Sequence, residues 1–217
     1  PSSSSAASDV YKRQIWNILH NQGKKSNVIG WWPSNPAEPI NGVMVSNLYQ
    51  LANKPLKEKW EMPDGTVHPK SMEDILKEFR VHPEELTGNH LIPFIPNIKK
   101  IDTKKDKRVA SIAKILANAA SIHAASTYLQ RETEWDFMAI YHDAIDHFCH
   151  SAMKFHPPQR QGIPDDLYEN YKGVVEAGYM FHDMMLDRTL SMIDDNTTVI
   201  IVSDHGFHSD HLRPRYL

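Results

Sequence analysis

Cysteine is nearly absent from this sequence, and that scarcity limits the kinds of site it can build. The 217 residues include one cysteine, Cys149. A single thiol excludes an intramolecular disulfide and a zinc site made from cysteines. No uninterrupted apolar run in the sequence approaches the ~18 residues that a membrane-spanning helix needs. We therefore expect no transmembrane segment.

An excess of either charge is also lacking. The sequence has 24 lysines and arginines against 27 aspartates and glutamates, for a net charge of -3. This balance gives no electrostatic reason to expect binding to nucleic acid or to an anionic membrane. The length is sufficient for one sizeable hydrophobic core.

The two ends of the sequence differ from the rest. There is no initiator methionine, and residues 1–14 begin with a tract rich in serine and alanine that matches nothing after it. We expect residues 1–14 to be a non-native or disordered leader, and residues 15–217 to form the folded part. Because residues 213–217 stop in what we interpret as a loop after a strand, we expect a fragment cut at both ends.

Between these ends, helical spacing and strand-like spacing of apolar residues follow one another, which is the rhythm of an α/β protein. The patterns predict, in chain order, a helix at 15–22, a strand at 28–32, an irregular loop at 33–46, a cap-like insertion at 47–104, a helix at 105–131, a strand at 135–141, a helix at 164–193 and a strand at 198–202. The last strand has four consecutive branched apolar residues, as in a strand buried on both faces. The fold class that follows is α/β, with a mainly parallel sheet flanked by helices.

Polar residues that can bind a metal follow the last apolar run at once. Asp204 and His205 are adjacent, and Gly206 permits a sharp exit from the strand. Open α/β sheets bind ligands at the carboxyl ends of their strands. A carboxylate beside an imidazole at that position suits a divalent metal such as zinc.

A second carboxylate–imidazole pair follows the predicted strand at 135–141. Asp146 and His150 are four residues apart, so one face of a helix capped by Asp143 would carry both. Taken alone, the pair fits equally well with an Asp146 that stabilises the helix start and a solvated His150. Because Asp204 and His205 repeat the combination after another strand, we favour metal ligation.

Three further polar residues are interpreted as structural. His123 lies on the apolar face of the predicted helix at 105–131, and a lone histidine on such a face is more often a satisfied core residue than a ligand. His182 and Asp183 lie within a dense amphipathic run, and we assign them the same kind of role.

The segments Asp146-x-x-x-His150 and Ser203-Asp204-His205-Gly206 resemble those of the alkaline phosphatase superfamily, most closely its type I phosphodiesterase / nucleotide pyrophosphatase branch. The resemblance extends over most of the chain after Gln14. It implies an alkaline phosphatase-like catalytic domain with two divalent metal ions, usually zinc, that bind a phosphoryl group. By this resemblance, Asp146 and His150 would hold one ion, and Asp204 and His205 the other.

The resemblance also implies residues that we do not find. A late histidine at the first ion should lie beyond Leu217, and an early aspartate and a threonine or serine nucleophile have no counterpart before Ile15. His208 and His211 are close to the expected ligands in sequence and are candidates for contact with substrate. Asp143 and Asp210 are candidates for accepting hydrogen bonds from the ligand histidines.

The expected function of the intact protein is metal-dependent hydrolysis of phosphate esters, as a phosphodiesterase, pyrophosphatase or phosphatase acting through a covalent phospho-enzyme. Its partner would be a small phosphate ester or nucleotide. Two alternatives stay open: a phosphomutase or sulfatase of the same superfamily, and a non-catalytic binding module that retains the fold. Because the nucleophile is missing and each ion has two ligands, we expect the 217-residue chain to have at most weak activity.

Overall fold

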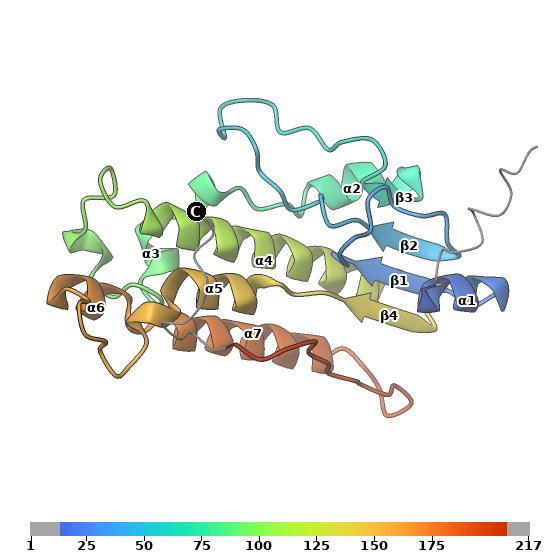
Figure 1. The fold of residues 1–217 in the computed structure, drawn as a ribbon. Helices are drawn as coiled ribbons and strands as arrows, with labels where there is room; N and C mark the ends of the chain where they lie inside the picture. Colours follow the sequence, from blue (N-terminus) through green and yellow to red (C-terminus); the bar gives the residue numbers. More distant parts are fainter. Residues whose placement is uncertain (1–13, 208–217) are drawn as a thin grey trace, which may run out of the picture. The chain divides into compact units, whose positions relative to one another are not determined.

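The computed structural model describes residues 14–207, which divide into two compact units. Among the described residues, the first unit contains 14–49, 61–80 and 124–141, and the second contains 50–60, 81–123 and 142–207. Figure 1 shows the helices and strands of both units. No helix among residues 14–207 is long and apolar enough to cross a membrane.

The first unit is built on a four-stranded sheet with the order β3-β2-β1-β4. Its strands are β1 (Ser26–Ile29), β2 (Gly42–Val45), β3 (Val67–His68) and β4 (Phe137–Ile140). β1 pairs in parallel with β2 and with β4, while β3 pairs antiparallel with β2. All four side chains of β1 are buried, as expected for the centre of a mainly parallel sheet. The predicted α/β class is therefore confirmed.

One strand of this sheet lies where the sequence pattern predicted only an irregular loop. β2 lies within residues 33–46, and the prolines that precede it concealed its short Val43-Met44-Val45 core. The strand begins at Gly42, whose φ of 132° suits glycine. A Cβ on Gly42 would meet the backbone carbonyl oxygen of Ser26 at 2.1 Å, so the two strands approach closely only because Gly42 has no side chain.

Two short helices complete the first unit. α1 (Ile15–Asn21) begins after Gln14 and buries Trp16, which forms an apolar cluster with Val28 and Met44 of the sheet. α2 (Glu73–Lys77) buries Leu76, whose carbonyl oxygen accepts a hydrogen bond of 2.6 Å from the hydroxyl of the fully buried Tyr49. α1 was predicted from helical spacing at 15–22 and ends one residue earlier than expected.

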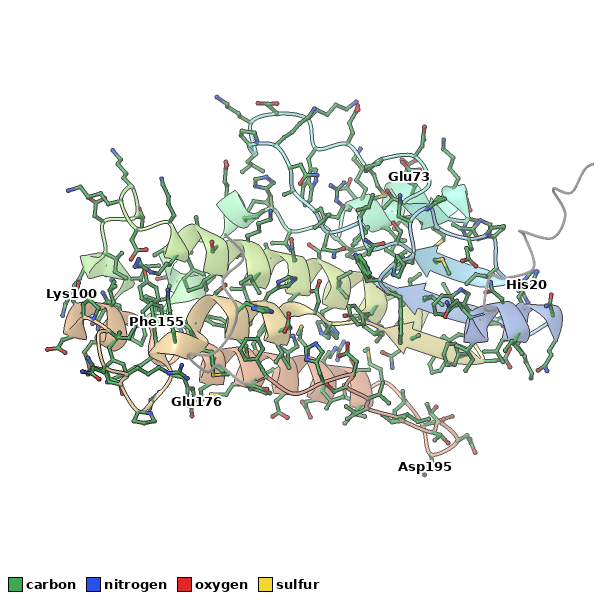
Figure 2. The ribbon with its side chains drawn as sticks, viewed as in Figure 1. His20, Glu73, Lys100, Phe155, Glu176 and Asp195 are labelled. Carbon is green, nitrogen blue, oxygen red and sulfur yellow. The ribbon has the colours of Figure 1, made fainter. Side chains whose placement is uncertain are left out.

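The second unit is helical. Its helices are α3 (Gly88–Leu91), the first part of α4 (Arg108–Glu132), α5 (Ala144–Ala152), α6 (Asp165–Tyr171) and α7 (Val174–Leu190). One apolar cluster joins them, and its largest fully buried side chains include Phe148, Phe155 and Tyr171. Figure 1 shows α5 between α4 and α7, and Figure 2 shows the side chains that fill the space between α5 and α7.

The predicted long helix at 164–193 is in fact two helices. α6 ends at Tyr171 and α7 begins at Val174, with Lys172 and Gly173 between them. Gly173 occupies the position before the first residue of α7 and has a φ of -89°. Glycine is among the poorest helix formers, so a break at this residue is physically reasonable. The apolar spacing continues across the break, which is why the pattern alone did not reveal it.

The predicted buried strand at 198–202 is not formed. After α7 the chain turns at Asp194–Thr197, where the Thr197 amide donates to the Asp194 carbonyl over 3.1 Å, and Asp195 marks this turn in Figure 2. Residues 198–202 have no strand conformation, and the side chains of Ile200, Ile201 and Val202 are 73–77% exposed. An apolar run becomes a strand only when a neighbouring strand supplies hydrogen bonds to its backbone. None of the strands in residues 14–207 pairs with this run.

Candidate functional site

Helix α5 presents the first predicted pair of ligands. Its buried face is formed by Ala144, Phe148, Cys149 and Ala152, which pack into the apolar cluster of the second unit. Asp146 and His150 lie off that face, with side chains that are 37% and 40% exposed. A helix places residues four apart on the same side, and burial of the apolar face therefore turns both polar groups outward. The predicted shared face is confirmed.

The two side chains of this pair contact each other. His150 Nε2 lies 3.3 Å from Asp146 Oδ2. The other carboxylate oxygen, Asp146 Oδ1, is buried and has no hydrogen-bond partner within the described part of the chain. A buried carboxylate oxygen without a donor is costly, and such atoms call for a specific explanation. A cation bound at Oδ1 would provide one.

Asp143 has a different role from the one predicted. It occupies the N-cap position of α5, but its side chain makes no capping hydrogen bond. Its carboxylate instead lies 3.4 Å from Nε2 of His147, one turn along the helix. The hydrogen bond with Asp143 raises the pKa of His147. Asp143 therefore pairs with an exposed histidine that was not among the predicted ligands.

The second predicted pair lies in an exposed segment rather than at the end of a strand. His205 Nε2 is 3.8 Å from Asp204 Oδ2, and the side chains of His205 and Asp204 are 60% and 81% exposed. Two local hydrogen bonds shape the segment: Ser203 Oγ donates to the His205 carbonyl over 2.6 Å, and His205 Nδ1 donates to the Gly206 carbonyl over 2.9 Å. The second bond leaves Nε2 as the nitrogen available to a ligand.

The segment that carries the second pair returns to the helix that carries the first. The ring of Phe207 packs edge-on against His150, with 4.9 Å between the ring centroids. The pKa of His205 is raised by its hydrogen bond to Gly206, by Asp204 and also by the carboxylate of Asp146. Asp146 is therefore close enough to His205 to act on it electrostatically. The two pairs are more than fifty residues apart in the sequence, and the contact of Phe207 with His150 brings the segments that carry them together in one unit.

The donors in this area are of the kind that zinc binds, although they are not gathered around one point. Carboxylate oxygens and imidazole nitrogens suit zinc. The buried Oδ1 of Asp146 accepts no hydrogen bond among the described residues, so its lone pairs are available to a cation. Among residues 14–207, no group of three or more histidine, cysteine, aspartate or glutamate side chains is arranged to hold a metal ion. The pairs themselves are the candidate ligands.

Three residues named from the sequence lie outside the described part of the chain. His208 and His211, the candidates for substrate contact, and Asp210, a candidate hydrogen-bond acceptor, all follow residue 207. A hollow of about 230 Å³ in the second unit is lined by residues of α4, α5 and α6, and the four candidate ligands do not contribute to it.

Sequence reasoning overlooked the aromatic contact that connects the two pairs. Phe207 follows the Asp-His-Gly triplet directly, and it packs against the apolar cluster as well as against His150. A large apolar residue beside a polar motif was the available signal. It does not by itself indicate which surface the ring will contact.

The comparisons with known proteins give a family but no individual relative. A family model described as type I phosphodiesterase / nucleotide pyrophosphatase matches residues 3–211. No curated protein and no solved structure matched the chain. The matched family consists of hydrolases of phosphate esters, and it belongs to the alkaline phosphatase superfamily.

Proposed function

The chain belongs to the type I phosphodiesterase / nucleotide pyrophosphatase family, and from this premise we propose that its second unit carries the metal-binding part of a phosphodiesterase site. Asp146 with His150, and Asp204 with His205, would each hold one divalent ion, zinc in the first instance. A bound ion of this kind neutralises phosphoryl oxygens and stabilises the entering and leaving groups of an in-line displacement. The substrate class is a small phosphodiester or a nucleotide.

The observation that supports this proposal best is that the segment carrying Asp204 and His205 packs against the helix carrying Asp146 and His150. Asp146 lies near enough to His205 to raise its pKa, and Phe207 brings the second segment against His150. Two-metal phosphoryl-transfer sites require two sets of ligands a few ångströms apart.

The chain's own residues have distinct tasks in this proposal. Asp146 would offer its unpartnered Oδ1 to an ion while Oδ2 keeps its contact with His150. His205 would bind through Nε2, because its Nδ1 is engaged with the Gly206 carbonyl. Phe207 would restrict the rotation of the His150 ring by packing against it. His208 and His211 are proposed to contact the substrate, although both lie outside the described residues.

The early aspartate, the threonine or serine nucleophile and the late histidine are proposed to come from outside this sequence. We therefore expect the 217-residue chain to bind the product of the reaction but to have at most weak hydrolytic activity. A phosphomutase or sulfatase remains the alternative within the superfamily. Its discriminating feature is the nucleophile, since sulfatases use a group derived from cysteine and phosphoryl transfer uses serine or threonine.

A non-catalytic binding module is the second candidate function. It is favoured by the finding that no three metal-binding side chains among residues 14–207 are arranged around one point. Such a module would keep the fold and could bind one ion without the ability to turn over substrate. The presence or absence of a serine or threonine nucleophile would distinguish it, because a binding module has no need of one.

Calorimetric titration of adenosine monophosphate in the presence and absence of zinc tests the proposal. We expect the nucleotide to bind only when zinc is present, and its affinity to fall at least about tenfold in Asp204→Asn. Substitution of residues that only support a metal ligand already lowers metal affinity by this much. Asp183→Asn is the matched control, since Asp183 is an exposed carboxylate on α7 that belongs to neither pair. Binding that ignores zinc, or that Asp183→Asn weakens as much as Asp204→Asn, would contradict the proposal. Binding of inorganic sulfate in preference to phosphate would favour the sulfatase alternative.

A further inference from the structure

Three histidines from separate parts of the chain gather inside the second unit. His123 lies on α4, His142 precedes α5, and His182 lies on α7. We call them the histidine trio. The ring centroids of His123 and His142 are 6.5 Å apart, and those of His142 and His182 are 5.7 Å apart with the rings perpendicular. The proposed phosphodiesterase function does not use any of the three.

Hydrogen bonding indicates that His142 and His182 are neutral in the folded protein. His182 Nδ1 donates to the Gly178 carbonyl over 2.7 Å, one turn earlier on α7. Its Nε2, and Nδ1 of His142, are buried and have no hydrogen-bond partner among the described residues. A protonated imidazole carries a hydrogen on both nitrogens, so either ring would then bury an unsatisfied and charged donor.

The charges around the trio also oppose protonation. The positive charge of Arg188, on α7, lowers the pKa of His123. Protonated histidines of the trio would also repel one another. Asp143, at the start of α5, is the acidic group that favours protonation of His142 and His182, and it is already engaged with His147. Burial lowers the pKa of His123 and His182, and it lowers the pKa of His142 to about 3.

The trio is placed where its charge would separate packed elements. α7 packs closely against α5, since a Cβ on Gly178 would lie 2.8 Å from the ring of the buried Phe148. His182 is four residues after Gly178 on α7, and His142 immediately precedes the N-cap of α5. The described residues hold no cluster of three side chains placed as metal ligands, so the trio is not arranged as a metal site.

We propose that the histidine trio is an acid-sensitive latch, which holds α7 against α4 and α5 at neutral pH and releases it as the pH falls below about 6. His142 is followed four residues later by Asp146, so opening of the latch would also loosen the candidate ligands on α5. The latch stands on the packing of the trio alone, and it holds whether or not the proposed function is correct.

The direction of the effect follows from proton linkage. In the closed state the trio is neutral because its pKa values are lowered, whereas in the open state each ring returns to the ordinary pKa of 6.5. The open state therefore binds more protons, and closing becomes less favourable as the pH falls through 6.5. One histidine with a closed-state pKa of about 3 favours opening by about tenfold on going from pH 7.5 to pH 5.5.

Native-state hydrogen exchange on the 217-residue chain is the first test. We expect the protection factors of the α7 amides to fall at least about tenfold between pH 7.5 and pH 5.5. The amides of β1 (Ser26–Ile29), in the other unit, should change much less. Equal changes in α7 and β1, or no change in α7, would overturn the latch.

Substitutions distinguish an effect of the histidine trio from a general loss of stability at acid pH. His182→Asn keeps a donor near Nδ1 for the Gly178 carbonyl but cannot be protonated, so the change in α7 protection between pH 7.5 and pH 5.5 should become smaller. His20→Asn, at an exposed histidine of α1, is the matched control and should leave the response unchanged. An unchanged response in His182→Asn would contradict the proposal.

A measurement on the wild type guards against a variant that fails to fold. Imidazole resonances followed by NMR should show the trio neutral for as long as α7 remains protected. Three trio rings that titrate near pH 6.5 while α7 stays protected would rule out the latch.

Discussion

The partly buried carboxylate of Asp106 illustrates how single residues hold the second unit together. Its Oδ2 accepts a hydrogen bond of 2.7 Å from the Tyr171 hydroxyl, and its Oδ1 accepts one of 2.7 Å from Arg108 Nη1 and one of 3.0 Å from the Arg108 amide. Burial alone would raise the pKa of Asp106, but these hydrogen bonds outweigh it and lower the pKa. Asp106 therefore joins the start of α4 to the end of α6.

We predict that Asp106→Asn lowers the free energy of unfolding by about 1–2 kcal/mol at pH 7, because it weakens charge-assisted hydrogen bonds. The lowered pKa means that Asp106 contributes its stability above pH 3.8 and loses it as the pH falls through the folded-state value. The difference between variant and wild type should thus shrink below about pH 4. Urea unfolding at several pH values measures it.

Asp64→Asn is the control for this prediction. Asp64 is 97% exposed and lies 3.6 Å from the exposed Lys70, so its removal should have little effect. If Asp64→Asn lowers the free energy of unfolding as much as Asp106→Asn does, the hydrogen bonds of Asp106 are not the cause of the destabilisation.

Residue spacing revealed part of the candidate site but not how it is assembled. The four-residue separation of Asp146 and His150 was enough to predict their shared helical face, because the geometry of a helix is local. The contact of Phe207 with His150 and the gathering of the histidine trio depend on how distant segments fold together. His123 and His182 were assigned structural roles one at a time, and their proximity to His142 could not be read from the sequence.

At the scale of helices and strands, the close approach of α7 to α5 depends on a residue without a side chain. A Cβ on Gly178 would lie 2.8 Å from Cδ2 and 3.1 Å from Cγ of Phe148, which is 1% exposed and cannot move freely. We predict that Gly178→Ala lowers the free energy of unfolding by about 1–3 kcal/mol through overpacking. Thermal or urea unfolding provides the measurement.

Gly173→Ala is the matched control for the same substitution. A Cβ at Gly173 has no atom within 4 Å, and the residue does not have a positive φ. Its replacement should be neutral or slightly stabilising, since alanine restricts the unfolded chain more than glycine does. Destabilisation by both variants to the same extent would mean that the contact with Phe148 does not limit the packing.

The exposed run at 198–202 leads to a second prediction at this scale. Ile200 is 77% exposed, so Ile200→Ala should change the free energy of unfolding by less than about 0.5 kcal/mol. The matched variant is Ile29→Ala, at a fully buried residue of β1, which should cost about 2–5 kcal/mol. A large cost at Ile200 would indicate that this run is buried in solution, as its apolar pattern suggested.

Helices and strands were predicted well where the apolar pattern was long and local. They were predicted poorly where contacts with distant segments determine whether an element forms. α4, α5 and β4 were found because their spacing extends over several turns or a full strand. β2 was missed because three prolines precede its short apolar core, and the break before α7 was missed because the apolar spacing continues through Gly173. The run at 198–202 resembles a strand in sequence but lacks a pairing partner among the described residues.

At the scale of the whole molecule, the two units have different contents. The first holds the sheet, and the second holds both candidate ligand pairs and the histidine trio. The assignment to a family of phosphate ester hydrolases rests on a match to nearly all of the chain. The roles of Asp146, His150, Asp204 and His205 rest on their donor chemistry and on the meeting of the two segments in one unit.

Zinc titration calorimetry on the wild type, Asp146→Ala and Asp204→Ala tests this central claim most directly, with Asp183→Ala as the control and circular dichroism to verify folding. We predict that the wild type binds zinc, that each of the first two substitutions removes a distinct share of the binding, and that the control removes none. A folded wild type that binds no zinc, or binding that survives both substitutions, would contradict the account.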